Sequence, residues 1–267
     1  MDEVVVDGTD VIGSVRLNRP ERGNSVTPAV VTELGDAVQR LCDTDAVRAV
    51  VLTGTGSVFC AGADVREMYD VYQGDGPDGL MSYLADVWMP AVQRTVRLIW
   101  GAPKPVVAAF NGAATAGGLD FGLACDVRVA ASTARFAESY VNLGMVPVAG
   151  GAFLLPLVAG LPAATRLLAS GAFVDAERAL SLGIVNEVCA PDELDACARE
   201  LAAELAHGPA ETFAQTKTIA RGVSTPAFEA ALRDSLNANI ALIARPEVRE
   251  RILSVMERFS TSAARRA

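Results

Sequence analysis

The stretch Asn111–Asp126, NGAATAGGLDFGLACD, decides the fold, and the rest of the chain supports it. It follows Val106–Phe110, a short apolar run typical of a buried strand, and its small residues let the chain turn directly into a helix. A helix that begins near Gly117 directs unpaired N–H groups and the positive end of its dipole into the space before it. Such a place favours an oxyanion, and Asp120, one turn later, adds a carboxylate for proton chemistry. The alternative is that the glycines only permit close packing.

The composition is that of a globular protein that stays in the cytoplasm. Of the 267 residues, 51% are hydrophobic and 21% are charged, which is enough to bury a large core. The sequence has no run near the ~20 apolar residues that span a bilayer, and its start, MDEVVVDGTD, is acidic where a signal peptide is basic. We therefore expect no membrane partner. The net charge of −9 also argues against nucleic acid as a partner.

The cysteines and the single histidine argue against a metal site. The cysteines are odd in number and lack a CxxC pair, so we expect small buried hydrophobes rather than disulfides or zinc ligands. They are Cys42, Cys60, Cys125, Cys189 and Cys197. His207 precedes Gly208-Pro209, where a helix is expected to end. Carboxylates, a tyrosine and backbone amides are therefore the expected catalytic groups.

The order of elements predicts an α/β architecture. The first half contains a hairpin over residues 4–17, a helix at Pro28–Cys42 capped by Thr27, a strand at Val47–Thr53, helices at Arg66–Tyr72 and Leu80–Trp100 interrupted at Gly74–Gly79, and strands at 106–110 and 128–130. From Leu161 onward the pattern is almost entirely helical. The expected helices are Leu161–Ala169, Asp175–Leu182, Pro191–Ala206, Ala210–Val223, Ala227–Ile243 and Pro246–Phe259.

A second small-residue loop, Cys60–Val65, also joins a strand to a helix and exposes the amide of Ala63. If the two preceding strands are parallel, both loops aim their amides at one point. The nearby Gly54-Thr55-Gly56 resembles the start of a dinucleotide fingerprint. Phe59 stands where its third glycine belongs, so we set that interpretation aside.

These motifs together resemble the crotonase, or enoyl-CoA hydratase/isomerase, superfamily over about residues 4–260. The matching segments are Leu17-Asn18-Arg19-Pro20 with Asn24, Val50–Gly54, Phe59–Asp64, Lys104-Pro105-Val106, Asn111-Gly112 through Cys125-Asp126, and Leu143-Gly144 with Pro147 and Gly150-Gly151. The resemblance implies an α/β spiral of ββα units. The core that binds acyl-CoA would occupy residues 1–200, and a C-terminal helical trimerisation region would occupy 201–267. It also implies a homotrimer or a hexamer made of two trimers.

The resemblance implies a role for each loop. The amides of Ala63 and Gly117 would form the oxyanion hole that holds the thioester oxygen as an enolate develops, and losing one such donor typically costs ~3–4 kcal/mol in barrier. Coenzyme A, the carrier part of the substrate rather than a bound cofactor, would contact Arg22, Gly23, Ser25, Ala61, Asp64 and Val65. Arg22 is the expected phosphate partner, with a solvated loop charge as the alternative.

The chain departs from the family pattern at the catalytic pair. Hydratases of this family place two glutamates where this sequence has Asp120 and Tyr140. Asp120 reaches about one methylene less far, and a phenol with a pKa near 10 is a poor base at neutral pH. Glu138 would share the face of Tyr140 if the segment were extended and would point elsewhere if it were helical.

Three functions remain open. In the first, Asp120 would act as the acid/base on an enoyl-CoA, as in a hydratase or a double-bond isomerase, with Tyr140 hydrogen-bonding water or substrate. In the second, the pocket would support other enolate chemistry, such as hydrolysis, decarboxylation or ring closure. In the third, the protein would only bind acyl-CoA. The family's acyl pocket corresponds to the aromatic segment Met68–Met89, part of which is expected to be core.

Overall fold

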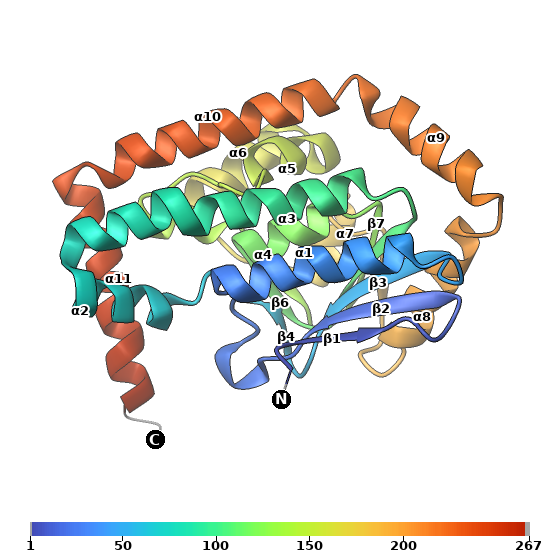
Figure 1. Cartoon of the computed structure of the whole chain (residues 1–267), viewed down its shortest axis with the longest axis horizontal. Coiled ribbons are helices and arrows are strands. Elements are labelled where there is room, and N and C mark those ends of the chain that lie inside the picture. Colours follow the sequence, from blue (N-terminus) through green and yellow to red (C-terminus); the bar gives the residue numbers. More distant parts are fainter. Residues whose placement is uncertain (1, 265–267) are drawn as a thin grey trace.

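Two sheets form the centre of the molecule (Figure 1). The structure, a computed structural model, describes residues 2–264. The larger sheet has six strands in the order β1-β2-β3-β5-β7-β10, and the smaller has four in the order β4-β6-β8-β9. The strands are β1 Val4–Asp7, β2 Ile12–Leu17, β3 Ala49–Gly54, β4 Val58–Cys60, β5 Val106–Phe110, β6 Ala113–Thr115, β7 Val127–Ala131, β8 Arg135–Ala137, β9 Val174–Asp175 and β10 Glu187–Cys189.

The strands form the predicted spiral of ββα units. In each of the pairs β3/β4, β5/β6 and β7/β8, the first strand joins the larger sheet and the second joins the smaller. A helical segment follows each pair. Within each sheet these strands pair in parallel. As a result, the segments that follow β4 and β6 leave the same edge of the smaller sheet, as the sequence predicted.

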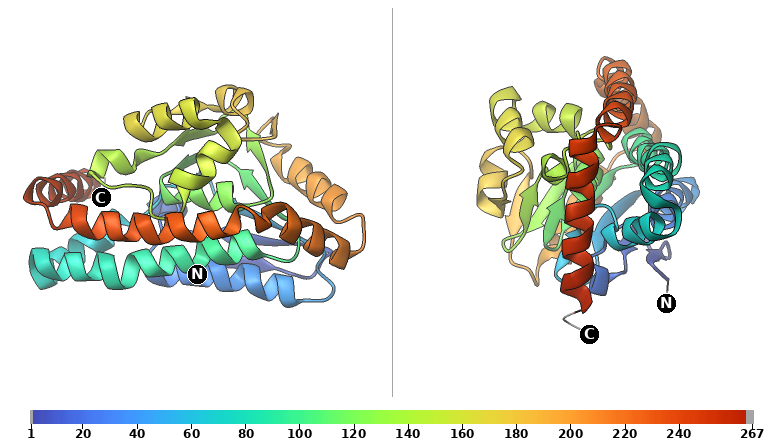
Figure 2. Two further views of the ribbon diagram at one scale, coloured as in Figure 1. Left: turned by 90° about the horizontal axis from the view of Figure 1, so that it is seen from above. Right: turned by 90° about the vertical axis from the view of Figure 1, so that its left-hand side faces the viewer.

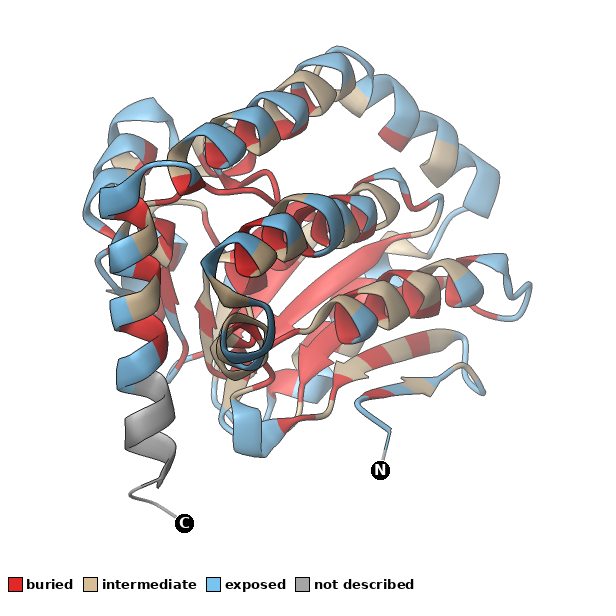
Figure 3. Cartoon of the chain, turned by 60° about the vertical axis from the view of Figure 1, so that its left-hand side comes forward, coloured by how far each residue is buried: buried red, intermediate tan, exposed pale blue. Residues whose placement is uncertain are grey.

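Helices cover the sheets on the outside (Figure 2). They are α1 Pro28–Asp43, α2 Val65–Ser82, α3 Met89–Gly101, α4 Gly117–Ala124, α5 Gly151–Ala159, α6 Leu161–Ser170, α7 Ala176–Ser181, α8 Leu194–Leu205, α9 Ala210–Gly222, α10 Thr225–Ile243 and α11 Pro246–Ala264, with a π-helical turn at Tyr83–Trp88 and 3-10 turns at Pro20–Arg22 and Ser139–Leu143. Figure 3 shows the helices buried mainly on their inward faces and the central strands buried throughout. Among the described residues, none of these helices is long and apolar enough to cross a bilayer.

Local sequence signals explain most of these boundaries. Thr27 caps α1 as predicted, since its hydroxyl accepts from the Val30 amide at 3.2 Å. The predicted interruption at Gly74–Gly79 is wrong in extent: the helix continues to Ser82 and is only kinked, at Gly76 with φ 71° and ψ −171°. Gly76 tolerates this positive φ and Pro77 has no N–H to donate, so the break is confined to one point. The sequence pattern also did not predict α5, which contains Pro156.

The C-terminal helices fold back over the core. Helix α10 runs beside α3 (Figures 1 and 2), where Gln93 Nε2 donates to the Leu232 carbonyl at 2.7 Å and Arg97 pairs with Glu229 at 2.9 Å. Helix α11 packs on α2.

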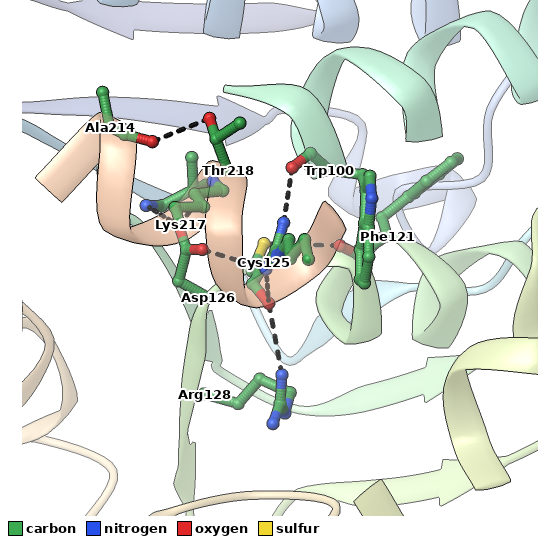
Figure 4. Close-up of polar contacts among 10 residues, drawn as sticks. Trp100, Phe121, Cys125, Asp126, Arg128, Ala214, Lys217 and Thr218 are labelled. Carbon is green, nitrogen blue, oxygen red and sulfur yellow. Dashed lines mark hydrogen bonds and ion pairs between the residues drawn. The ribbon is translucent and has the colours of Figure 1, made fainter. Parts of the chain in front are cut away.

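Helix α9 is held by charge. Figure 4 shows Lys217 directed at Asp126, the second residue after α4, with Arg128 bonded to the Cys125 carbonyl. Asp126 also accepts from Arg221 at 2.9 Å and from the Val106 amide at 2.8 Å. Asp126 therefore has a structural role, since its contacts join α9 and the start of β5.

Candidate active site

The two small-residue loops meet. A Cβ on Gly62 would lie 3.2 Å from the Thr115 carbonyl oxygen and 3.4 Å from the Ala116 methyl group, so the chains touch at this point. Thr115 Oγ1 donates to the Ala61 carbonyl at 3.0 Å, which ties the loops together. Ala116 has φ 49°, a left-handed value that is strained for a non-glycine residue and that directs the chain into α4.

The amides of Ala63 and Gly117 are free to bind a ligand. In the parallel bridge between Val26 and Ala63, the bonds use the Gly62 carbonyl and the Asp64 amide, so the Ala63 N–H points to the other side. Gly117 is the first residue of α4, where an amide has no partner within the helix. Neither amide has an acceptor within residues 2–264. The arrangement has the features of an oxyanion hole.

A cavity of about 560 Å³ opens beside these amides. Ala63, Gly117 and Tyr140 line it, whereas Asp120 and Glu138 do not. One wall is apolar and is formed by Met68, Leu84, Trp88, Leu143, Met145, Phe173, Ile252, Val255 and Met256. A cavity of this size suits a small-molecule substrate with an apolar part.

Tyr140 stands between the cavity and Asp120. Its hydroxyl donates to Asp120 Oδ2 at 2.9 Å. A Cβ added to Gly117 would lie 3.3 Å from the same hydroxyl, so Tyr140 also lies against the oxyanion loop. Asp120 itself is 0% exposed. A proton can therefore pass between the cavity and Asp120 through one hydroxyl group.

Glu138 approaches Asp120 from the residue before the Ser139–Leu143 turn. It is 1% exposed, and its carboxyl lies within hydrogen-bond reach of the Asp120 carboxyl. The sequence left its direction open between an extended and a helical segment. Although Tyr140 lies in a 3-10 turn, both side chains reach Asp120.

Burial dominates the electrostatics of these three groups. Burial raises the pKa of Asp120 to about 6, while the nearby donor groups of Glu138 and Tyr140 and the Gly151 and Ala149 amides lower it. The pKa of Glu138 is raised well above its ordinary value by burial and by the Asp120 charge. The pKa of Tyr140 is also raised well above its ordinary value, by burial and then by the two carboxyl groups. Near neutral pH, Asp120 is thus ionised while Tyr140 keeps its proton.

The residues predicted to contact coenzyme A mostly line the cavity. Arg22, Ser25, Ala61, Asp64 and Val65 do so, whereas Gly23 does not. The carboxylate of Asp64 is already in use, because it pairs with Arg19 at 2.9 Å and accepts from the Arg66 amide at 3.1 Å. Only its outer surface is left for a ligand.

The sequence did not predict that Arg66 and part of α11 line the cavity. Arg66, in the first turn of α2, adds a second cation beside Arg22. Three residues of α11 form part of the apolar wall, although the sequence pattern indicated only an amphipathic helix. Within the predicted acyl segment, Met68, Leu84 and Trp88 face the cavity.

The described residues contain no cluster of three or more side chains suited to hold a metal ion. All five cysteines are free thiols; Cys42, Cys60 and Cys125 are buried as expected, whereas Cys189 and Cys197 are only half-buried.

Comparison with known proteins agrees with this architecture. The sequence profile of the family "Enoyl-CoA hydratase/isomerase" matches residues 7–261. The crotonyl-CoA hydratase of Syntrophomonas wolfei is 34% identical over 72% of this chain and 71% of its own. The 1,2-epoxyphenylacetyl-CoA isomerase of Escherichia coli is 36% identical over 73% of each chain.

Solved structures give the same assignment. The crystal structure of an enoyl-CoA hydratase/isomerase from Pseudoalteromonas atlantica superimposes with a TM-score of 0.83 at 30% identity, covering 96% of this chain and 98% of that one. On the profile, the relatives and the shared fold, the chain belongs to the enoyl-CoA hydratase/isomerase family.

Proposed function

We propose that the protein acts on an acyl-CoA thioester and isomerises the double bond of an enoyl-CoA, with Asp120 as the base and Tyr140 as the group that touches the substrate. The observation that carries the proposal is the single hydrogen-bonded route from the cavity through Tyr140 to Asp120, beside two free amides. Moving a proton from one carbon to another requires only one acid/base group, which serves twice.

A proton leaves the carbon next to the thioester carbonyl and joins the Tyr140 oxygen, while the phenolic proton of Tyr140 passes to Asp120 Oδ2. The electron pair of the broken C–H bond forms an enolate, whose oxygen accepts from the Ala63 and Gly117 amides. The proton then returns by the same route to the far carbon of the allylic system. Tyr140 is neutral before and after each transfer, so its high pKa is no obstacle.

Hydration is the second candidate, because one relative is a crotonyl-CoA hydratase. It requires a group to activate water and another to protonate carbon. Here neither Glu138 nor Asp120 lines the cavity, and Tyr140, which does, is hydrogen-bonded to Asp120. Asp120 and Glu138 therefore cannot act on a substrate as two independent carboxylates at the cavity, which favours isomerisation.

Coenzyme A would enter along the rim that carries Arg22 and Arg66. These side chains give an acidic protein, with net charge −9, a local positive site for phosphate groups. The apolar wall that includes Trp88 and Met256 would hold the acyl group.

The test is product analysis with trans-3-hexenoyl-CoA in D2O. We expect trans-2-hexenoyl-CoA carrying deuterium, and a fall in kcat of about 10²–10⁴-fold for Asp120→Asn. Tyr72→Phe, at a tyrosine outside the cavity lining, is the matched control for Tyr140→Phe. A product consisting mainly of 3-hydroxyhexanoyl-CoA would replace isomerisation with hydration. Calorimetric binding of the ester without turnover would instead indicate a carrier.

A further inference from the structure

The carboxyl pair behind Tyr140 has too few hydrogen-bond donors for two negative charges. Among the described residues, Asp120 Oδ1 and both carboxyl oxygens of Glu138 lack a hydrogen-bond partner of normal geometry. Both side chains are fully or almost fully buried, and an unpaired buried carboxylate is costly. Two carboxyl groups this close become partners only when one of them carries a proton.

Gly151, the first residue of α5, brings the two groups together. A Cβ on Gly151 would collide with Asp120 Oδ1 and would lie 2.6 Å from Glu138 Oε1. Because glycine stands there, both oxygens occupy the space beside the start of α5. The Gly151 amide faces the same place and lowers the pKa of Asp120.

No cation compensates this pair within residues 2–264. The titratable groups facing Asp120 are Glu138, from the end of the β8 segment, and Tyr140, from the turn that follows. Helix α5 contributes backbone amides. Helix α3, which packs on α4, directs Arg94 to Asp36 and Arg97 to Glu229, both in exposed ion pairs.

We infer that Glu138 is a positioning residue that remains protonated at neutral pH and donates its carboxyl proton to Asp120 Oδ1, so that Asp120 is the ionised member of the pair. The buried carboxyl pair beside Gly151 does not depend on the proposed function, whereas the effect of Glu138 on turnover rests on that function.

The role of Glu138 is to keep Asp120 ionised and oriented. With Glu138 donating to Oδ1 and Tyr140 donating to Oδ2, both oxygens of Asp120 have a side-chain donor and the carboxylate plane is fixed. When Asp120 takes up the substrate proton on Oδ2, Glu138 keeps its own proton and no further charge appears. Glu138 never touches the substrate, because it does not line the cavity.

Infrared spectroscopy tests the shared proton without any turnover. We expect the wild-type protein at pH 7.5 to show the carbonyl stretch of a protonated carboxylic acid that is lost in Glu138→Gln. Glu67→Gln is the control, because burial also raises the pKa of Glu67, which lies on α2 away from this pair. A spectrum in which Glu138→Gln removes only a carboxylate band would overturn the inference.

The pH dependence of kcat tests the positioning role. Glutamine at 138 still donates to Asp120, so the pH at which kcat falls on the acidic side of the profile should be the same in Glu138→Gln as in the wild type. Leucine donates nothing, so this pH should be higher in Glu138→Leu by about one pH unit or more. If Glu138 were ionised, the acidic fall in kcat would occur at a lower pH in both variants. If its role were only packing, the pH of this fall would not change in either variant. Either result would overturn the inference, and the infrared test remains decisive if Glu138→Leu does not fold.

Discussion

Two aspartates at opposite ends of α4 have contrasting surroundings. Asp126, just after the helix, is largely buried among cations and accepts from Lys217 and Arg221 at 2.9 Å each. Asp120, inside the helix, is fully buried without a cation and faces Glu138 and Tyr140 instead. The ion pairs of Asp126 thus hold α9 to the core. The buried carboxylate of Asp120 has no cation beside it among the described residues, so its ionisation lowers the stability of the fold.

The difference separates a structural role, that of Asp126, from the catalytic role proposed for Asp120. The carboxylate of Asp126 is committed to its ion pairs with two cations and does not line the cavity. A carboxylate that burial pushes to a pKa of about 6, and that is joined to a cavity by a hydroxyl, is suited to take up and return a proton. The same substitution at both positions should therefore have opposite consequences.

The largest expected effect is on activity. Asp120→Asn removes the proton acceptor, and kcat should fall by about 10²–10⁴-fold. Asp126→Asn leaves the route from Tyr140 intact, so its kcat per folded molecule should match that of the wild type. Steady-state kinetics on both variants, normalised to the folded fraction from circular dichroism, make the measurement. Equal losses in both would remove the distinction drawn between the two aspartates.

Stability should change in the opposite sense. Asp126→Asn leaves Lys217 and Arg221 without their counter-charge, and the free energy of unfolding should fall by about 3 kcal/mol. Because the folded-state pKa of Asp120 is raised, its contribution to stability is complete below the unfolded pKa near 3.8 and is lost as the pH rises to about 6. Asp120→Asn should therefore be more stable than the wild type at pH 7.5, and this gain should vanish at pH 4. Urea unfolding at both pH values tests this.

A smaller effect is expected in the pH profile. Asp120 must be ionised to accept a proton, so wild-type kcat should decline as the pH falls through about 6. A rate that stays constant down to pH 4.5 would mean that Asp120 is not the base.

The smallest effect concerns the rim. Arg22 is exposed, and an exposed ionic contact contributes at most about 1 kcal/mol, so Arg22→Ala should raise KM about fivefold and leave kcat unchanged. Arg66→Ala should act in the same way, and the KM of the wild type should rise with salt concentration. Arg166→Ala is a control outside the cavity lining. An unchanged KM in both rim variants would place the phosphates elsewhere.

Local patterns predicted much of the fold. Small residues at strand-to-helix turns located the loops of Ala63 and Gly117, and the helical cap at Thr27 lies where the sequence indicated. These features depend on residues close together in the chain. Helix α5 was missed because Gly150-Gly151 and Pro156 are poor helix signals, although α5 packs against α4.

The candidate site was predicted in part. Asp120 and Tyr140 were identified, but the burial of Asp120 behind Tyr140 depends on packing among α4, α5 and the turn at Ser139–Leu143. The direction of Glu138 also depends on a backbone with ψ 76°, between extended and helical. No periodicity in the sequence encodes such a conformation.

The central claim is that Tyr140 carries protons between the substrate and Asp120. The most direct measurement is the exchange of hydrogen for deuterium at the carbon next to the carbonyl of hexanoyl-CoA, followed by NMR in D2O. We expect the exchange catalysed by Tyr140→Phe to fall to the level of Asp120→Asn, while Tyr72→Phe exchanges at the wild-type rate. Wild-type exchange by Tyr140→Phe would contradict the account, because Asp120 would then reach the substrate by another route.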